Sequence, residues 1–186
     1  MVDETHKTAV VVIPPDEVWA PIQALRAAHD RRLRRWMPHI TLLYPFRPVA
    51  EFCAVKDALV AACDTQLEFD VALAEFGAFH HPHDHYTVWL KPEPSEPFVE
   101  LRAALSAHAA PGDGDEPARA HFQPHLSVGQ VEGKMAMLRL VSELQAAWKP
   151  VRFCVSAISV ICRQAPPDDV FHVAFTVPLA ARPKAA

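Results

Sequence analysis

The chain has 186 residues, of which 51% are hydrophobic and 22% are charged. This length and composition are typical of one soluble globular domain that can bury a hydrophobic core. No apolar run approaches the roughly 20 residues that span a bilayer, so we expect no contact with a membrane. The amino-terminal sequence MVDETHKT lacks the basic start and the apolar stretch of a signal peptide, and we therefore expect a cytoplasmic protein.

The net charge of −4 does not suit a protein that holds long nucleic acid by charge alone. We therefore expect no DNA partner, whereas a small phosphate-bearing substrate is compatible with the composition. The four cysteines show neither C-x-x-C spacing nor zinc-type clustering, so free thiols in a reducing compartment are expected. We expect the protein to be a monomer.

Secondary-structure patterns follow one another in a similar order twice along the chain. The first half predicts a strand at 8–13, a helix at 16–29, a strand at 38–44, a helix at 51–63 and a strand at 67–79, with Gly77 a candidate interruption. The second half predicts a strand at 86–90, a helix at 96–109, a strand at 122–129, a helix at 134–148, and strands at 151–162 and 170–177. By composition, residues 111–117 form a loop.

The repeated order predicts a duplicated architecture. Each half contains a strand that begins with Pro-His, and the two histidines are 86 residues apart. We predict an α+β fold of one domain over residues 1–186, made of two pseudo-symmetric lobes at about 1–80 and 81–180, between which elements can be exchanged. The bilobal fold is expected to have two mainly antiparallel sheets, outer helices and a central cleft.

The two Pro-His sites carry the residues best suited to chemistry. They read PHITL (38–42) and PHLSV (124–128). Because side chains alternate between faces along a strand, His39 shares a face with Thr41, and His125 shares one with Ser127. The apolar residues between them point the other way and can anchor each strand on a core. If a pseudo-twofold axis relates the halves, the two polar faces meet across one cleft.

Two imidazoles and two hydroxyls suit displacement at a phosphodiester. One neutral and one protonated histidine can activate the attacking oxygen and protonate the leaving oxygen near pH 7, and either ring can take either role. Hydroxyls can donate hydrogen bonds to the non-bridging phosphate oxygens. We therefore predict His39, Thr41, His125 and Ser127 as catalytic residues, and neither a metal nor another cofactor.

The motifs resemble those of the 2H phosphoesterases, a family that includes the 2′-5′ RNA ligase-like proteins and is defined by two H-x-[ST]-x motifs. The flanks RWMPHITLLYPF (35–46) and FQPHLSVGQ (122–130) also look like those of the family. The resemblance implies a bilobal fold with a cleft and metal-independent catalysis. The activity it implies is hydrolysis of a 2′,3′-cyclic phosphate at an RNA end, or of a related cyclic or 2′-5′ nucleotide ester.

Substrate-binding groups are expected beside the motifs. Ligase-like members often carry a basic residue shortly after the second motif, where this chain has Gln130, whose amide can still hydrogen-bond a phosphate. Arg34, Arg35 and Arg47 flank the first motif and could supply positive charge instead, or form a solvated basic surface. We predict Gln130 and Arg47 as substrate-binding residues.

Aromatic and histidine side chains offer further contacts. Trp36, Phe122 and Tyr86 can stack on a base, and we predict them as substrate-binding residues, although each also suits a core position. The run 80–85 (HHPHDH) could place His81, His83 and His85 on one side and bind a transition metal or contact a nucleotide. A polar loop is the simpler interpretation, and we predict no metal site.

A second class of function fits the same residues. A binding module could recognise phosphorylated RNA ends or small nucleotides without turnover, and Gln130 together with the acidic net charge leaves room for it. In both cases the expected partner is an RNA terminus or a small nucleotide with a cyclic phosphate.

Overall fold

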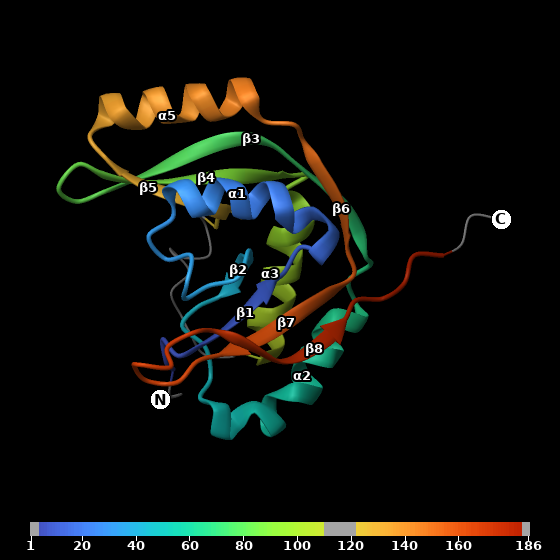
Figure 1. Ribbon diagram of the computed structural model, residues 1–186. Coiled ribbons are helices and arrows are strands. Elements are labelled where there is room, and N and C mark those ends of the chain that lie inside the picture. The colour runs from blue at the N-terminus through green and yellow to red at the C-terminus, as the bar shows by residue number, and fades with distance from the viewer. Residues whose placement is uncertain (1–3, 110–121, 184–186) are drawn as a thin grey trace.

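The computed structural model describes residues 4–109 and 122–183, and two antiparallel sheets lie at the centre of this part of the chain (Figure 1). The first sheet has the order β2-β1-β7-β8, formed by β2 (Ile40–Leu43), β1 (Thr8–Val12), β7 (Ala157–Cys162) and β8 (His172–Pro178). The second has the order β5-β4-β3-β6, formed by β5 (Leu126–Glu132), β4 (His85–Glu93), β3 (Phe69–His81) and β6 (Val151–Val155). The predicted α+β class with antiparallel sheets is confirmed, whereas the division into two pseudo-symmetric lobes stays a prediction.

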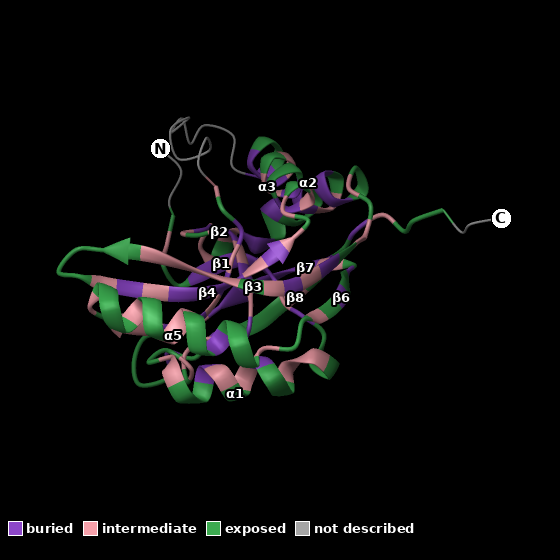
Figure 2. Ribbon diagram, turned by 90° about the horizontal axis from the view of Figure 1, so that it is seen from above, coloured by how far each residue is buried: buried purple, intermediate pink, exposed green. Residues whose placement is uncertain are grey.

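Helices cover both sheets. Helices α1 (Trp19–His29) and α5 (Lys134–Ala147) pack against strands of the second sheet, and α2 (Phe52–Asp64) and α3 (Glu96–Ala109) pack against the first. Figure 2 shows buried residues along the strands and exposed residues on the outer sides of the helices. None of the helices in residues 4–109 and 122–183 is long and apolar enough to cross a membrane.

The strands that follow the two motif histidines are both edge strands. Among the described residues, β2 pairs only with β1, and β5 pairs only with β4. These two edges contact each other, so the border between the sheets brings the beginnings of both motifs into one region. The topology therefore supplies the meeting point that the duplicated motifs predict.

The apolar members of both motifs anchor these strands on the core. Ile40 and Leu42 in β2 are buried, and so are Leu126 and Val128 in β5. Burying each such side chain contributes about 1.5–3 kcal/mol relative to leaving it in water. The predicted alternation is thus confirmed, and it holds the polar members at the surface of the border between the sheets.

One predicted strand, at 151–162, is two strands in different sheets. β6 ends at Val155 and pairs with β3, whereas β7 begins at Ala157 and pairs with β1 and β8. Only Ser156 separates them. The apolar run continues through both strands, so periodicity alone could not reveal that the chain changes sheets there.

Two central strands continue through a glycine or a proline. β3 runs through Gly77 without interruption. A Cβ atom at this position would lie 2.4 Å from the Trp89 ring, so the glycine makes room for the indole. β4 continues through Pro92, which pairs with Leu73 of β3. The pairing of β4 with β5 ends at Leu90, so no second partner requires the N–H that proline lacks.

Several other boundaries also differ by a few residues. The first helix begins at Trp19, after a short 3-10 turn (Asp16–Val18), and the motif strands begin at Ile40 and Leu126, one residue after each histidine. β5 also extends to Glu132, which places Gln130 within the strand. The predicted loop at 111–117 lies outside the described residues.

Candidate active site

The two motif histidines are held in the same way. His39 immediately precedes β2, and its Nδ1 donates to the carbonyl of Met37 at 2.7 Å. His125 immediately precedes β5, and its Nδ1 donates to the carbonyl of Gln123 at 2.9 Å. A carbonyl can only accept, so both rings carry their proton on Nδ1. Each Nε2 therefore presents its lone pair to a ligand.

The hydroxyl residues are the second members of the same two strands. Thr41 and Ser127 are both half-buried, and the residues on either side of each are buried. Within residues 4–109 and 122–183, neither hydroxyl is engaged in a hydrogen bond with another protein group. Both hydroxyls are therefore able to donate to an oxygen that approaches from the histidine side.

Aromatic rings fix the orientation of His39. Trp36 stacks on the imidazole with a centroid distance of 4.7 Å and on Phe171 with a distance of 3.8 Å. Two nearly parallel neighbours at these distances must occupy opposite faces of the indole. Trp36 therefore has no free face on which a base could stack, and we propose that it positions His39 instead.

A different set of rings surrounds His125. Phe79 meets the imidazole edge-on at 4.8 Å, and Trp89 lies 6.0 Å from it at a tilt of 59°. Phe79 also stacks on Trp89 at 4.9 Å, and the Trp89 ring lies over Gly77. The interior of the second sheet thus forms an apolar wall beside the His125 ring.

Burial makes both imidazoles weak bases in the free protein. It lowers the pKa of His39 from 6.5 to about 4, and the Arg26 and His125 charges act in the same direction, against the Met37 carbonyl and Asp30. Burial also lowers the pKa of His125, against its hydrogen bond to Gln123. Because the charge of His125 acts on His39, the two rings lie within electrostatic reach of each other. Both are neutral near pH 7.

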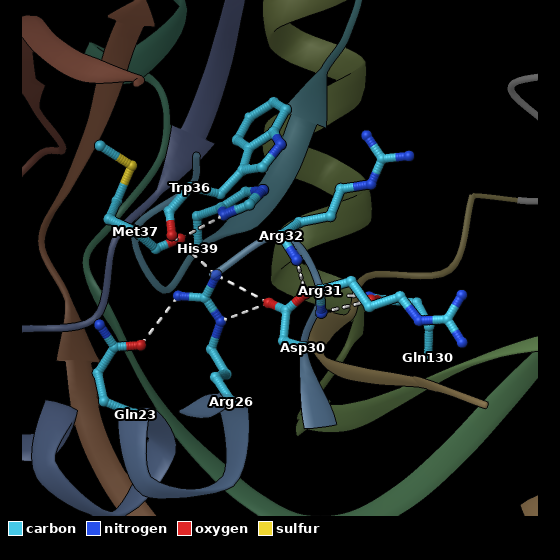
Figure 3. Close-up of polar contacts among 9 residues, drawn as sticks. All are labelled: Gln23, Arg26, Asp30, Arg31, Arg32, Trp36, Met37, His39 and Gln130. Carbon is cyan, nitrogen blue, oxygen red and sulfur yellow. Dashed lines mark hydrogen bonds and ion pairs between the residues drawn. The ribbon is translucent and has the colours of Figure 1, made fainter. Parts of the chain in front are cut away.

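A buried ion pair connects α1 to the segment that carries His39 (Figure 3). Arg26 and Asp30 have side-chain exposures of 2% and 3%, and Arg26 Nε donates to Asp30 Oδ2 at 2.9 Å. The same guanidinium donates to Gln23 Oε1 at 3.0 Å and to the Trp36 carbonyl at 2.8 Å. Burying a charge is costly unless it is paired, and the Arg26 guanidinium meets this requirement with three acceptors, one of them in the segment before His39.

Gln130 joins this network from the other sheet. Its Oε1 accepts from the backbone N–H of Arg31 at 2.9 Å, and its Nε2 donates to Asp30 Oδ1 at 3.1 Å. The amide therefore ties β5 to the segment after α1 and retains one N–H for a ligand. A role of Gln130 in substrate binding stays a proposal, and the contacts give it a positioning role as well.

The other predicted binding residues, Tyr86, Phe122 and Arg47, do not lie together in one pocket. Tyr86 is buried, stacks on His80 at 4.9 Å and lines a pocket together with Gln130. Phe122 lies under the Arg102 guanidinium at 4.6 Å, beside α3. Arg47 forms an ion pair with Glu51 at 3.4 Å and donates to a carbonyl at the end of α3. Of these, Tyr86 lies in the same pocket as Gln130.

The histidine run at 80–85 forms the end of a hairpin rather than one extended edge. His81 and His85 face each other in the register of β3 and β4, and His81 Nε2 lies 2.9 Å from the Thr87 hydroxyl. His83 lies in the turn with a φ of 62°, so it does not continue the row of His81 and His85. No group of three His, Cys, Asp or Glu side chains suited to a metal occurs in residues 4–109 and 122–183.

Sequence reasoning missed two features of this region. Arg26 falls on the apolar face of a predicted helix, and only its i, i+4 spacing to Asp30 hints at the ion pair. Arg31 and Arg32 fall in a basic connector between predicted elements, but they line the pocket that contains Gln130 and Tyr86. The paired arginines at 31–32 and 34–35 were the available signal.

Comparisons with known proteins agree with this geometry. A family model described as the 2′-5′ RNA ligase superfamily matches residues 14–166. Among solved structures, the chain is similar to TT0787 of Thermus thermophilus, with 21% identity, a TM-score of 0.62, and 94% of this chain and 98% of that chain covered. It is also similar to E. coli LigT complexed with 3′-AMP, with 18% identity, a TM-score of 0.60, and coverage of 95% and 99%.

The two kinds of similarity carry different weight. The structural similarity, at identities of 21% and 18%, shows the fold. No curated protein matches the chain significantly. The family match, in contrast, extends over more than half of the sequence and includes both histidine motifs. The chain therefore belongs to the 2′-5′ RNA ligase superfamily, a group of the 2H phosphoesterases.

Proposed function

We propose that this protein hydrolyses a 2′,3′-cyclic phosphate at an RNA end, or a related cyclic or 2′-5′ nucleotide ester, with two histidines as acid and base. Membership of the superfamily supports an enzyme of the phosphodiesterase type. The observation that carries the proposal is the matched anchoring of His39 and His125, which leaves the two Nε2 atoms free at the meeting point of two edge strands.

The reaction needs one proton removed and one supplied. The oxygen of a water molecule attacks phosphorus while one Nε2 accepts the proton of the water. The bond between phosphorus and one ribose oxygen breaks, and the other ring, protonated on Nε2, gives that proton to the departing oxygen. Thr41 and Ser127 donate hydrogen bonds to the non-bridging oxygens, where negative charge increases in the transition state. The orientation of the bound substrate decides which ring acts as base.

Substrate binding provides the protonated ring. Both imidazoles are neutral in the free protein at pH 7, and a negatively charged phosphodiester beside them raises the pKa of an adjacent histidine. A neutral ligand would not produce this change. The complex of E. coli LigT with 3′-AMP supports a nucleotide phosphate as the class of substrate.

Hydrolysis of 2′,3′-cyclic nucleotides and of cyclic-ended oligoribonucleotides tests the proposal, with product position determined by NMR. His39→Ala and His125→Ala should each lower kcat by about 10²–10⁴-fold, the usual contribution of a positioned acid or base. His108→Ala is a matched control, because His108 also bonds a carbonyl through Nδ1 but lies on the exposed side of α3.

The outcomes are distinct. Undiminished turnover in either motif variant would refute two-histidine catalysis. Binding of a cyclic nucleotide by the unmodified protein, with no product after hours, would favour the binding module.

A further inference from the structure

A pocket with a volume of about 570 Å³ lies beside the two motifs, and its lining is strongly basic. Arg31, Arg32, Arg34 and Arg35 come from the segment after α1, and His81 and His85 come from the β3–β4 hairpin. No Asp or Glu is among the described residues that line it. In a chain with a net charge of −4, so much positive charge in one pocket indicates an anionic ligand.

We propose that this arginine pocket binds a second phosphate group of the nucleotide substrate, separate from the phosphate that reacts. This inference rests on the proposed function and specifies its substrate as one with at least two phosphates. The source of the second phosphate is either the internucleotide linkage of an RNA strand or a terminal 5′-phosphate.

Two of the four arginines, Arg31 and Arg32, form no ion pair with the described residues. Arg34 and Arg35 both pair with Asp169, a buried carboxylate whose pKa their hydrogen bonds lower, so part of their charge is already balanced. Arg31 and Arg32, in contrast, use only backbone groups in the hydrogen bonds and ion pairs found among the described residues, and their guanidinium groups are not paired there. Figure 3 shows their guanidinium groups extending away from the Asp30 carboxylate.

The backbone beneath these two arginines is fixed. The N–H of Arg31 donates to Gln130 Oε1 at 2.9 Å, and the N–H of Arg32 donates to Asp30 Oδ1 at 2.8 Å. Asp30 is itself held by the buried Arg26. An anion therefore meets guanidinium groups whose backbone is already ordered, so less conformational entropy is lost on binding.

The pocket and the reacting groups share their supporting elements but not their position. Ser127 and Gln130 lie three residues apart in β5, at most about 10 Å along the strand, which has an irregular register between them. None of the four motif residues His39, Thr41, His125 and Ser127 is among the residues that line the pocket. The segment at 30–36 likewise carries the pocket arginines at one end and Trp36, which stacks on His39, at the other. A ligand with two separated phosphates can therefore place one at the motif histidines and the other among the pocket arginines.

Calorimetric binding of three ligands tests the proposal without requiring turnover. The ligands are a nucleoside 3′-phosphate, the same mononucleotide with a 5′-phosphate, and a dinucleotide with a 3′-phosphate. In the unmodified protein, a second phosphate should raise affinity about tenfold or more, as expected for charge-assisted hydrogen bonds of at least about 1.4 kcal/mol. The affinity for a ligand with the second phosphate should also fall more steeply with salt, because that ligand makes an additional ionic contact.

The double variant Arg31→Ala/Arg32→Ala should lose this gain and keep its affinity for the nucleoside 3′-phosphate. The backbone bonds of both residues survive the change, and retained mononucleotide binding verifies the fold. Arg139→Ala is the matched control, because it removes an exposed arginine paired with Glu143 on α5 and should preserve the gain. Whether the gain comes with the dinucleotide or with the 5′-phosphate identifies the source of the second phosphate.

Equal affinity for all three ligands would overturn the inference, and so would an equal loss for all three in the double variant. A gain that depends on Arg31 and Arg32 in a protein without hydrolytic activity would leave the pocket established and would refute only the proposed reaction.

Discussion

The pKa of His39 should make the stability of the fold depend on pH in a way that one substitution removes. An unfolded chain has an ordinary histidine pKa of 6.5, whereas the folded protein holds the pKa of His39 at about 4. Between these values the unfolded chain binds the proton and the folded chain does not. Stability therefore falls as pH falls, and linkage gives a loss of about 2 kcal/mol between pH 7 and pH 5.

His39→Asn isolates this effect. The asparagine amide can still donate to the Met37 carbonyl, which lies 2.7 Å from His39 Nδ1, but it does not titrate. Urea unfolding of both proteins at pH 7, 6 and 5 gives the free energy of unfolding for each. From pH 7 to pH 5, the free energy of unfolding of the unmodified protein should fall by about 2 kcal/mol more than that of the variant. Parallel curves would show that His39 is not held neutral by burial.

Two further predictions concern the reaction. Because both histidines have lowered pKa values in the free enzyme, kcat/KM should follow a bell-shaped pH profile. Its rising limb should lie near pH 4 and its falling limb at a pH lower than 6.5, so a maximum above pH 7 would contradict this prediction. Trp36→Leu should lower kcat by about ten- to a hundredfold, because His39 loses its stacking partner, and the limb near pH 4 should move upward as the ring becomes exposed. A change in KM alone, measured by steady-state kinetics on a cyclic nucleotide, would refute the positioning role.

Much of the fold could be predicted because each element has a local signature. The helix at 96–109 has the predicted bounds, and the motif strands show the expected alternation of buried and half-buried residues. What could not be predicted depends on partners distant in sequence. The chain changes sheets at Ser156 because the strands on either side of it pair with different partners. Pro92 is tolerated in β4 because the pairing of β4 with β5 does not extend beyond Leu90.

The candidate site shows the same division. Repetition in the sequence was sufficient to single out the two histidines and their hydroxyl neighbours as candidates. It could not show that Trp36 is enclosed between two rings, or that the Gln130 amide bonds the segment after α1. Those contacts join residues up to 135 positions apart, from Trp36 to Phe171, and periodicity carries no information about them.

The pairing of β1 with β7 sets the order in which the protein can form during synthesis. Thr8 pairs with Cys162, and at about 5–20 residues per second that partner is made roughly 8–30 s later. The second sheet is complete at Val155, before β7 begins. Until then β1 and β2 are a two-stranded pair, which is marginally stable in water. The sheet that contains β2, the strand after His39, can therefore be completed only after all strands of the sheet that follows His125 have been synthesised.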